Sequence, residues 1–278
     1  MIRIFDVENA LSIKCSVSEF IFCMGYCEYK IPFYVRGIKP PEHIESDMRK
    51  AEGKIGHEKE EKIEIEKIEN GLIKKITKEE LFTRLPDINS DLEFTREDVT
   101  TKLYYQAKVD AKKIELQLTG RADKILRRNG CLIIQEDKFP KKPSDYVNRN
   151  IPFSNQTLQA LIYLNSKFKK IDNKITMEDL WTCQNLKKLS EVSKPFEIPH
   201  KDKKWIINIR NRDIDTENNI VKTFEGVQTE KDKIYLEGNL YRFICLILEK
   251  KEKIHHNSPR KCNPCEFSGI CKFSLKSY

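Results

Sequence analysis

The dipeptide Asn129-Gly130 is the feature that most restricts how this chain can fold. Asn-Gly is the preferred two-residue loop of a tight β-hairpin, because both loop positions need positive φ angles. The flanking segments at 125–126 and 131–134 are apolar and contain several isoleucines, as strands often do. We therefore predict an antiparallel hairpin centred on this dipeptide.

The register of this hairpin brings acidic side chains together. With Arg128 paired to Cys131, pairing extends outward and sets Asp123 directly opposite Glu136. Directly opposed side chains lie about 5 Å apart, where two like charges destabilise a sheet. Lys138 shares the face of Glu136, because it lies two residues further along the strand. A divalent cation such as Mg²⁺ would neutralise the pair, and the alternative is a solvated hairpin balanced by nearby basic side chains.

Outside the hairpin, helical and strand-like patterns alternate along the chain. An aromatic-rich helix is predicted from a Ser18 cap through residue 35, and an amphipathic helix over 153–169. The remaining predictions are helices over 41–69 and 230–253 and strands within 101–139, at 180–184 and at 205–210. The mixture predicts an α/β core with a central mixed sheet flanked by helices.

The cysteines indicate a metal centre. Nine cysteines are an odd count, which argues against a framework made only of disulfides. Cys262, Cys265 and Cys271 lie in the segment CNPCEFSGIC, and two thiolates separated by two residues chelate one centre readily. Zinc held by four cysteines, or by three cysteines with His255 or His256, is one interpretation, and a four-iron cluster is the other.

The composition excludes several classes of protein. Of 278 residues, 39% are hydrophobic and 34% are charged, which indicates a globular chain. No segment has the roughly eighteen apolar residues of a membrane span, and the N-terminus lacks a signal-peptide pattern. We therefore expect a cytoplasmic protein without a membrane partner. The formal net charge of +8 suits a protein that binds a polyanion.

Four short segments resemble, in order along the chain, the motifs of RecB-like nucleases of the PD-(D/E)xK superfamily. They are GKIGH at 53–57, GRAD at 120–123, QEDK at 135–138 and QALIY at 159–163. The resemblance implies a restriction-endonuclease-like core that hydrolyses phosphodiester bonds with Mg²⁺ or Mn²⁺. The implied catalytic residues are Asp123, Glu136 and Lys138; the implied metal ligands are His57, Asp123, Glu136 and the backbone carbonyl of Asp137; and the implied supporting or DNA-contacting residues are Gln159 and Tyr163.

The cysteines extend the resemblance to the CRISPR-associated Cas-four exonuclease family. In the iron–sulfur branch of RecB-like nucleases, one cysteine near the N-terminus joins three near the C-terminus around a [4Fe-4S] cluster. The implied cluster ligands are Cys23, Cys262, Cys265 and Cys271. Cys27 is the alternative to Cys23. The sequence departs from the family at Met24-Gly25, where a Pro-Arg pair is common, and in a longer spacer between the histidine motif and Asp123.

The same resemblance implies an exonuclease that prefers single-stranded DNA or DNA ends. In a CRISPR setting it would trim captured DNA for spacer acquisition beside the integrase and its small partner subunit, with homo-oligomerisation left open. We expect one nuclease unit over 1–278, in which 1–40 and 254–278 form an iron–sulfur clasp and 41–253 form the nuclease core. Two alternatives are a RecB-like nuclease of DNA repair or recombination and a non-enzymatic, zinc-stabilised DNA-binding module.

Overall fold

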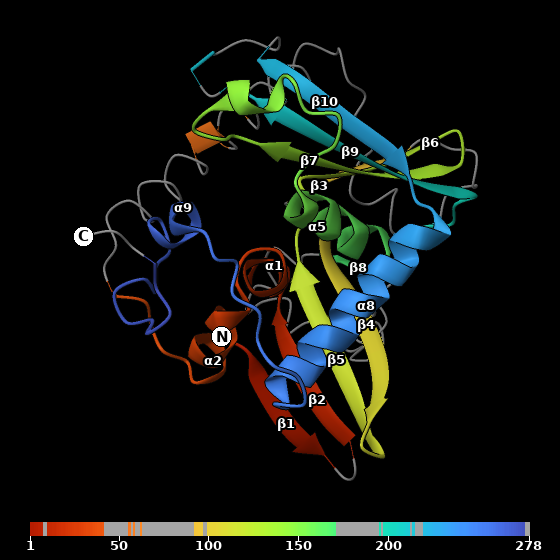
Figure 1. Cartoon of the computed structure of the whole chain (residues 1–278). Coiled ribbons are helices and arrows are strands. Elements are labelled where there is room, and N and C mark those ends of the chain that lie inside the picture. Colours follow the sequence, from red (N-terminus) through yellow and green to blue (C-terminus); the bar gives the residue numbers. More distant parts are fainter. Residues whose placement is uncertain are drawn as a thin grey trace, which may run out of the picture.

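A computed structural model describes the chain in ranges separated by gaps. These are residues 1–7, 10–41, 55–56, 58, 62, 92–96, 99–170, 195, 197–211, 213–214 and 219–275. Within these ranges the strands form two five-stranded sheets, with helices between and beside them (Figure 1).

Both sheets are mixed. The first sheet has the strand order β1 (Arg3–Val7), β2 (Ala10–Ser16), β5 (Lys112–Gly120), β4 (Val99–Val109) and β8 (Lys167–Lys170). The second has the order β10 (Ile220–Val227), β9 (Asp202–Arg210), β7 (Cys131–Lys138), β6 (Lys124–Arg128) and β3 (Leu92–Thr95). The β2–β5 and β7–β9 pairs are parallel, and the other pairs are antiparallel.

One central helix lies between the two sheets. The described helices are α1 (Val17–Met24), α2 (Ile31–Val35), α5 (Ser154–Leu164), α8 (Glu230–Ile247) and α9 (Pro259–Cys262), with 3-10 turns η1 (Glu28–Lys30) and η2 (Pro143–Tyr146). Helix α5 contacts β7 and β9 of the second sheet and β4 of the first, and it also packs against α1 and α8. The mixed α/β class is confirmed, but the strands divide between two sheets instead of one, because strand patterns alone do not specify distant partners.

The predicted hairpin is confirmed in both its turn and its register. Asn129 has φ 51° and Gly130 has φ 75°, the left-handed pair that a two-residue hairpin loop needs. Strands β6 and β7 pair from Arg128–Cys131 outward to Lys124–Gln135, which is the expected register. Side chains alternate across β7, so Glu136 shares the buried face of Leu132 and Ile134.

The N-terminal helix is shorter than predicted and has a different cap. Its N-cap is Ser16, not Ser18, because the Ser16 hydroxyl accepts the Glu19 N–H while the Glu19 carboxylate accepts the Ser16 N–H. The helix ends at Met24, where Gly25 approaches α5 so closely that a Cβ on it would lie 2.5 Å from Asn155 Cβ. The single helix predicted through residue 35 is therefore wrong, and the chain turns before η1 and α2.

Two other predicted helices also end early. The helix expected over 153–169 stops at Leu164, and 167–170 forms an edge strand on β4, because Phe168 is buried between exposed or half-buried lysines in a strand-like alternation. The helix expected through residue 253 stops at Ile247. The strand predicted at 205–210 is confirmed within β9, whereas the one predicted at 180–184 lies outside the described residues.

The helix predicted over 41–69 is described at five residues: Pro41 is not helical, and Ile55, Gly56, Glu58 and Lys62 are helical. None of the described helices has both the length and the apolar character that crossing a membrane requires.

Candidate functional site

Two carboxylates meet where the β6–β7 ladder ends. Asp123 directly precedes β6, and its backbone N–H donates to Glu136 Oε1 at 3.2 Å. The Asp123 carboxylate in turn accepts the Asp137 N–H at 2.9 Å through Oδ2. Each carboxylate is therefore held by the backbone of the opposite strand, which fixes the two acidic groups side by side.

Lysine, glutamine and tyrosine side chains complete a network around Glu136. Lys138 Nζ lies 2.7 Å from Glu136 Oε2 and donates to Gln159 Oε1 at 3.1 Å. Gln159 Nε2 donates to Glu136 Oε2 at 2.9 Å and to the Tyr163 hydroxyl at 3.3 Å. The spacing of four residues puts Gln159 and Tyr163 on one face of α5, directed at β7. The structure thus joins these predicted site residues in one hydrogen-bonded group with Asp123. We call it the acidic network.

The acidic network sets two carboxylates beside one lysine, and Arg96 Nη1 lies 3.9 Å from Asp123 Oδ1. Glu136 is 1% exposed, and burial together with the charge of Asp123 raises its pKa to about 7, although Lys138 acts in the opposite direction. Burial alone would lower the pKa of Lys138, but the nearby carboxylates outweigh it and raise that pKa, so the ammonium stays protonated. Burial also raises the pKa of Tyr163, which therefore stays neutral.

The donor set of the acidic network fits a hard divalent cation. Carboxylate oxygens are the ligands that Mg²⁺ and Mn²⁺ prefer. The pKa of Glu136 is raised mainly because the carboxylate is buried, and a bound cation would favour its charged form.

The Asp137 side chain points away from the acidic network and anchors β9. Its Oδ1 accepts from Asn208 Nδ2 at 2.9 Å and lies 3.0 Å from Arg210 Nε. Thr223 Oγ1 donates to Asn208 Oδ1, and Arg210 donates to Asn219 Oδ1 at 2.7 Å. Sequence reasoning missed this support, although the polar Asn208 and Arg210 in the apolar strand WIINIR were a readable signal.

Two glycines allow close packing around the acidic network. A Cβ on Gly120 would lie 2.8 Å from Val17 Cγ2 and 2.9 Å from Tyr163 Cε1. A Cβ on Gly56 would lie 2.6 Å from the ring of Phe139, the residue after Lys138. His57, the predicted metal ligand that follows Gly56, lies outside the described residues.

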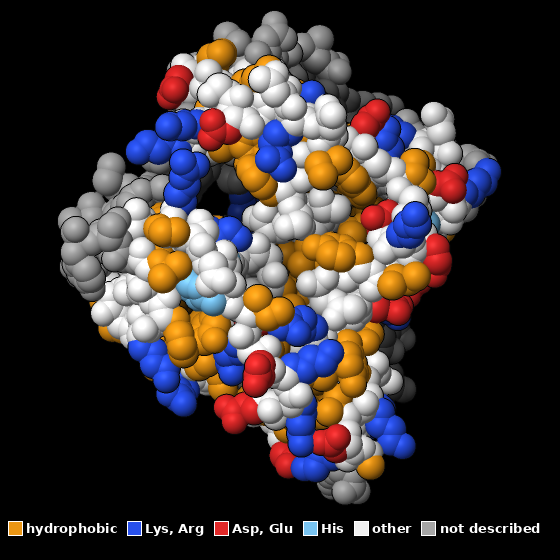
Figure 2. All heavy atoms as spheres, in the orientation of Figure 1, with side chains coloured by type: hydrophobic (Ala, Val, Ile, Leu, Met, Phe, Trp, Pro, Cys, Tyr) orange, Lys and Arg blue, Asp and Glu red, His pale blue; other side chains and the backbone are white. Residues whose placement is uncertain are grey.

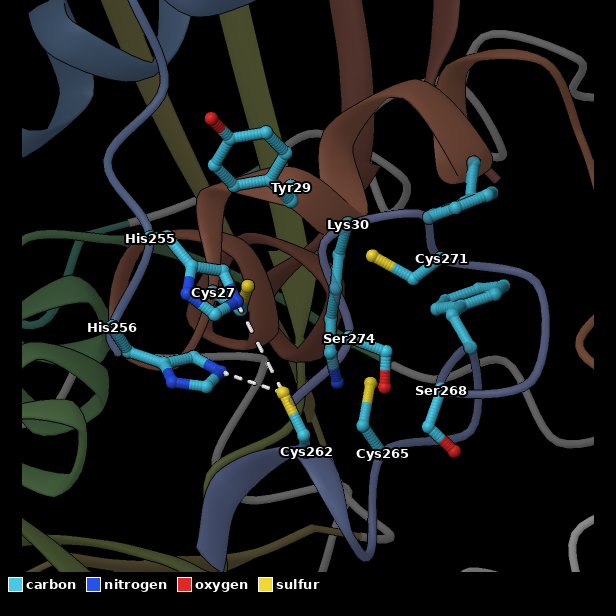
Figure 3. Close-up of a pocket in the computed structure, with 12 residues that line it drawn as sticks. Cys27, Tyr29, Lys30, His255, His256, Cys262, Cys265, Ser268, Cys271 and Ser274 are labelled. Atoms are coloured by element: carbon cyan, nitrogen blue, oxygen red, sulfur yellow. Dashed lines mark hydrogen bonds between the residues drawn. The ribbon is translucent and has the colours of Figure 1, made fainter. Parts of the chain in front are cut away.

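A second candidate site joins distant parts of the chain. Its lining includes Cys27, His255, His256, Cys262, Cys265 and Cys271 (Figure 3). We call it the cysteine pocket. Burial raises the pKa of Cys27 to about 11, and the nearby Cys265 and Cys271 act in the same direction. A Cys27, His255 and His256 group could hold a metal ion, because their ligand atoms lie within 4.8 Å of one another.

Cys23, the preferred fourth cluster ligand from the sequence, does not line the cysteine pocket. It is fully buried in the hydrophobic core beside residues such as Phe20, and burial raises its pKa well above the usual range. Because α1 ends at Met24 and the chain turns, Cys27 faces the pocket instead.

Ion pairs and rings hold the N-terminal and C-terminal segments together next to this pocket. Lys30 Nζ lies 2.9 Å from Glu266 Oε2, and the Tyr34 hydroxyl donates to Glu266 Oε1 at 2.9 Å. Phe33 stacks on Phe267 with ring centres 4.6 Å apart. The two segments therefore share an ion pair, a hydrogen bond and a ring stack beside the pocket.

The comparisons with known proteins leave the family open. No family model and no curated protein matches the sequence. Among solved structures, SSO0001 is 14% identical with a TM-score of 0.41, over 98% of this chain and 90% of that one. A protein from Eubacterium rectale named "Putative exonuclease" is 11% identical with a TM-score of 0.37, over 95% of this chain and 90% of that one.

Proposed function

We propose that this chain is a DNA exonuclease that depends on Mg²⁺ or Mn²⁺. The observation that carries the proposal is the acidic network, in which a carboxylate pair, a protonated lysine and a glutamine converge on one end of a hairpin. The match of GRAD, QEDK and QALIY to the RecB-like motifs supports the same chemistry.

The metal ligands in this proposal are Asp123, Glu136, the backbone carbonyl of Asp137 and His57. When bound, the cation would lower the pKa of a coordinated water and stabilise charge on the phosphate. Gln159 fixes the Glu136 carboxylate by donating to Oε2, so the ligand cannot rotate away.

Lys138 has an electrostatic role in this proposal. The raised pKa of Lys138 favours the protonated ammonium over the neutral amine that could accept a proton from water. Lys138 instead donates hydrogen bonds that orient the attacking water and stabilise negative charge near the scissile phosphate. Tyr163, which stays neutral, supports Gln159.

DNA would reach the acidic network across a basic surface. Figure 2 shows a hollow between the second sheet and the α9 lobe, with Lys and Arg side chains on its rim. The net charge of +8 is consistent with such a path for a polyanion. The preference for single strands or ends and a role beside the CRISPR integrase rest on the family resemblance.

A cleavage assay on single- and double-stranded DNA with Mn²⁺ tests the proposal. Asp123→Asn and Glu136→Gln should be inactive while their circular dichroism matches the parent. Glu115→Gln makes the same change at an exposed site on β5 and should be fully active. A folded and active Asp123→Asn protein would refute the site assignment.

We further propose that the cysteine pocket holds one [4Fe-4S] cluster as the clasp between 1–40 and 254–278. The donor chemistry fits, because a four-iron cluster takes four cysteine thiolates. The proposed ligands are Cys27, Cys262, Cys265 and Cys271. The lining of the pocket supports Cys27, and Cys23 is left to the core.

Anaerobic purification of two alanine variants tests this ligand set. Cys27→Ala should be colourless, and Cys23→Ala should keep the brown charge-transfer absorbance of the parent. Alanine avoids burying a hydroxyl at the fully buried Cys23. The reverse pattern would restore Cys23 as the ligand.

A further inference from the structure

Two adjacent histidines share the cysteine pocket with the thiols. His255 Nε2 lies 4.0 Å from Cys262 Sγ, and His256 Nε2 lies 3.8 Å from the same sulfur (Figure 3). Both histidines also belong to the group with Cys27 whose ligand atoms lie within 4.8 Å of one another. Both imidazoles therefore lie within reach of a sulfur from each segment, Cys27 and Cys262.

The spacing of these atoms suits a single tetrahedral ion. Zinc bonds to sulfur and imidazole nitrogen are about 2.3 Å and 2.0–2.1 Å, which puts neighbouring ligand atoms about 3.5 Å apart. The sulfur–nitrogen distances of 4.0 and 3.8 Å exceed that edge by a few tenths of an ångström. Cys262 would have to move inward only slightly to close a Cys2His2 site, and Cys27 would have to close a separation of up to 4.8 Å from the imidazoles.

The hydrogen bonds of the two imidazoles determine which ring nitrogen carries the proton and which can bind a metal. His255 Nδ1 lies 3.0 Å from Asn257 Oδ1, an acceptor that supports a proton on Nδ1 and leaves Nε2 free for a metal. The Asn257 N–H lies 3.2 Å from the same Nδ1 and would donate to it in the other tautomer, in which the proton is on Nε2. His256 Nδ1 accepts the Ser258 N–H at 3.0 Å, so Nε2 carries the proton. Binding a metal through Nε2 would move the proton of His256 to Nδ1, so His256 would lose its hydrogen bond from the Ser258 N–H. His255 would keep its hydrogen bond to Asn257 Oδ1.

We propose that the cysteine pocket also binds one Zn²⁺ through Cys27, Cys262, His255 and His256. Each zinc ion displaces the protons of two thiols. Because the set shares Cys27 and Cys262 with the proposed cluster, zinc and cluster exclude each other. Zinc would bridge the N-terminal and C-terminal segments without iron. This inference goes beyond the proposed nuclease and does not depend on its activity.

Metal titration of the full chain tests the zinc site. The protein is stripped of metal under anaerobic, reducing conditions, titrated with Co²⁺ as a coloured probe, and then titrated with Zn²⁺ in competition. One equivalent of Co²⁺ should give the absorbance of a tetrahedral ion with thiolate ligands. A double variant, His255→Ala with His256→Ala, should lose at least about 100-fold in zinc affinity, the upper range for losing an outer-shell partner.

A second double variant, Cys265→Ala with Cys271→Ala, is the matched comparison. It should keep the zinc affinity of the parent, because neither residue belongs to the proposed set. Reconstitution with iron and sulfide should give the opposite pattern, with a brown histidine variant and a colourless cysteine variant. Circular dichroism of both should match the parent.

The outcomes separate this inference from the proposed cofactor. Zinc binding that survives loss of both histidines, or that fails in the cysteine variant, overturns the Cys2His2 site and leaves the cluster proposal intact. Zinc binding as expected, with no cluster in any protein, supports the zinc site and overturns the cluster.

Discussion

Burial and the nearby Asp123 carboxylate both raise the pKa of Glu136, and this shift makes the stability of the protein depend on pH. An ordinary glutamate has a pKa of 4.5, whereas that of Glu136 is about 7. Between these values the folded chain binds more protons than the unfolded chain, so the metal-free protein loses stability as pH rises through this window, by up to about 3 kcal/mol.

Glu136→Gln should remove this loss, because a neutral amide carries no charge to bury. Urea unfolding with a chelator at pH 5 and pH 8 measures the effect, and the variant should be the more stable protein at pH 8. Adding Mg²⁺ at pH 8 should stabilise the parent more than the variant. Equal pH slopes for the two proteins would contradict the burial argument.

Replacement of Lys138 separates its role in orienting water from metal binding. Lys138→Met should lower kcat by about 10²–10³, the range for loss of one charge-stabilising donor. The affinity for Mn²⁺ should hold or rise, because a positive charge has been removed from beside the carboxylates. Lys141→Met is the control at an exposed lysine three residues on. A normal kcat at saturating metal with weakened metal binding would contradict this role.

At the scale of elements, the β6–β7 turn depends on its glycine. Gly130→Ala places a Cβ at φ 75° and should destabilise the protein by about 1 kcal/mol. Asn129→Gly should change stability little, because glycine also adopts positive φ. Thermal unfolding measures both variants. A wild-type melting temperature for Gly130→Ala would show that this turn does not set the hairpin.

The sequence predicted an element well where a local sequence pattern determines it, and poorly where contacts with distant segments determine it. The hairpin was predictable because Asn129-Gly130 encodes its own turn. The early end of α1 was not, because it reflects close packing of Gly25 on α5, which is distant in the chain. The parallel pairs β2–β5 and β7–β9 likewise join segments whose partners no local pattern names.

The candidate sites show the same division. Asp123, Glu136 and Lys138 were brought together by a register that the turn fixes. The sequence favoured Cys23 with Cys27 as the alternative, whereas the turn after Met24 brings Cys27 to the pocket. The Asn208 and Arg210 contacts with Asp137 needed knowledge that β9 lies next to β7.

At the scale of the whole molecule, a partly buried ion pair ties α8 to the N-terminal segment. Arg242 donates to both oxygens of Glu28 at 2.6 and 2.7 Å, and the Ile254 N–H donates to the same carboxylate. Arg242→Met should cost about 2 kcal/mol, below the figure for a fully buried pair because a quarter of the arginine side chain is exposed.

The same substitution should speed proteolysis of the C-terminal segment, measured by limited digestion. The matched control is Lys250→Met, which breaks an exposed pair with Asp110 and should change stability little. Equal effects of the two variants would show that the Glu28 pair is an ordinary surface contact.

The net charge of +8 predicts a salt-dependent affinity for DNA. If binding neutralises about six phosphates, the affinity for a single-stranded oligonucleotide should fall roughly 300-fold between about 50 and 200 mM salt. Fluorescence anisotropy across a salt series measures the slope. A flat slope would argue against phosphate contacts and for a protein or small-molecule partner.

The parallel pairing of β2 with β5 also sets a delay during synthesis. Ala10 pairs with Lys113, so β2 leaves the ribosome about a hundred residues ahead of its partner. At a synthesis rate of about 5–20 residues per second, the backbone groups on this edge of β2 remain unpaired for roughly 5–20 s. The exposed Lys14 on β2 discourages pairing with other nascent chains during that wait, as charged edge residues do. Chaperones that shield strand edges should therefore raise the yield of folded protein.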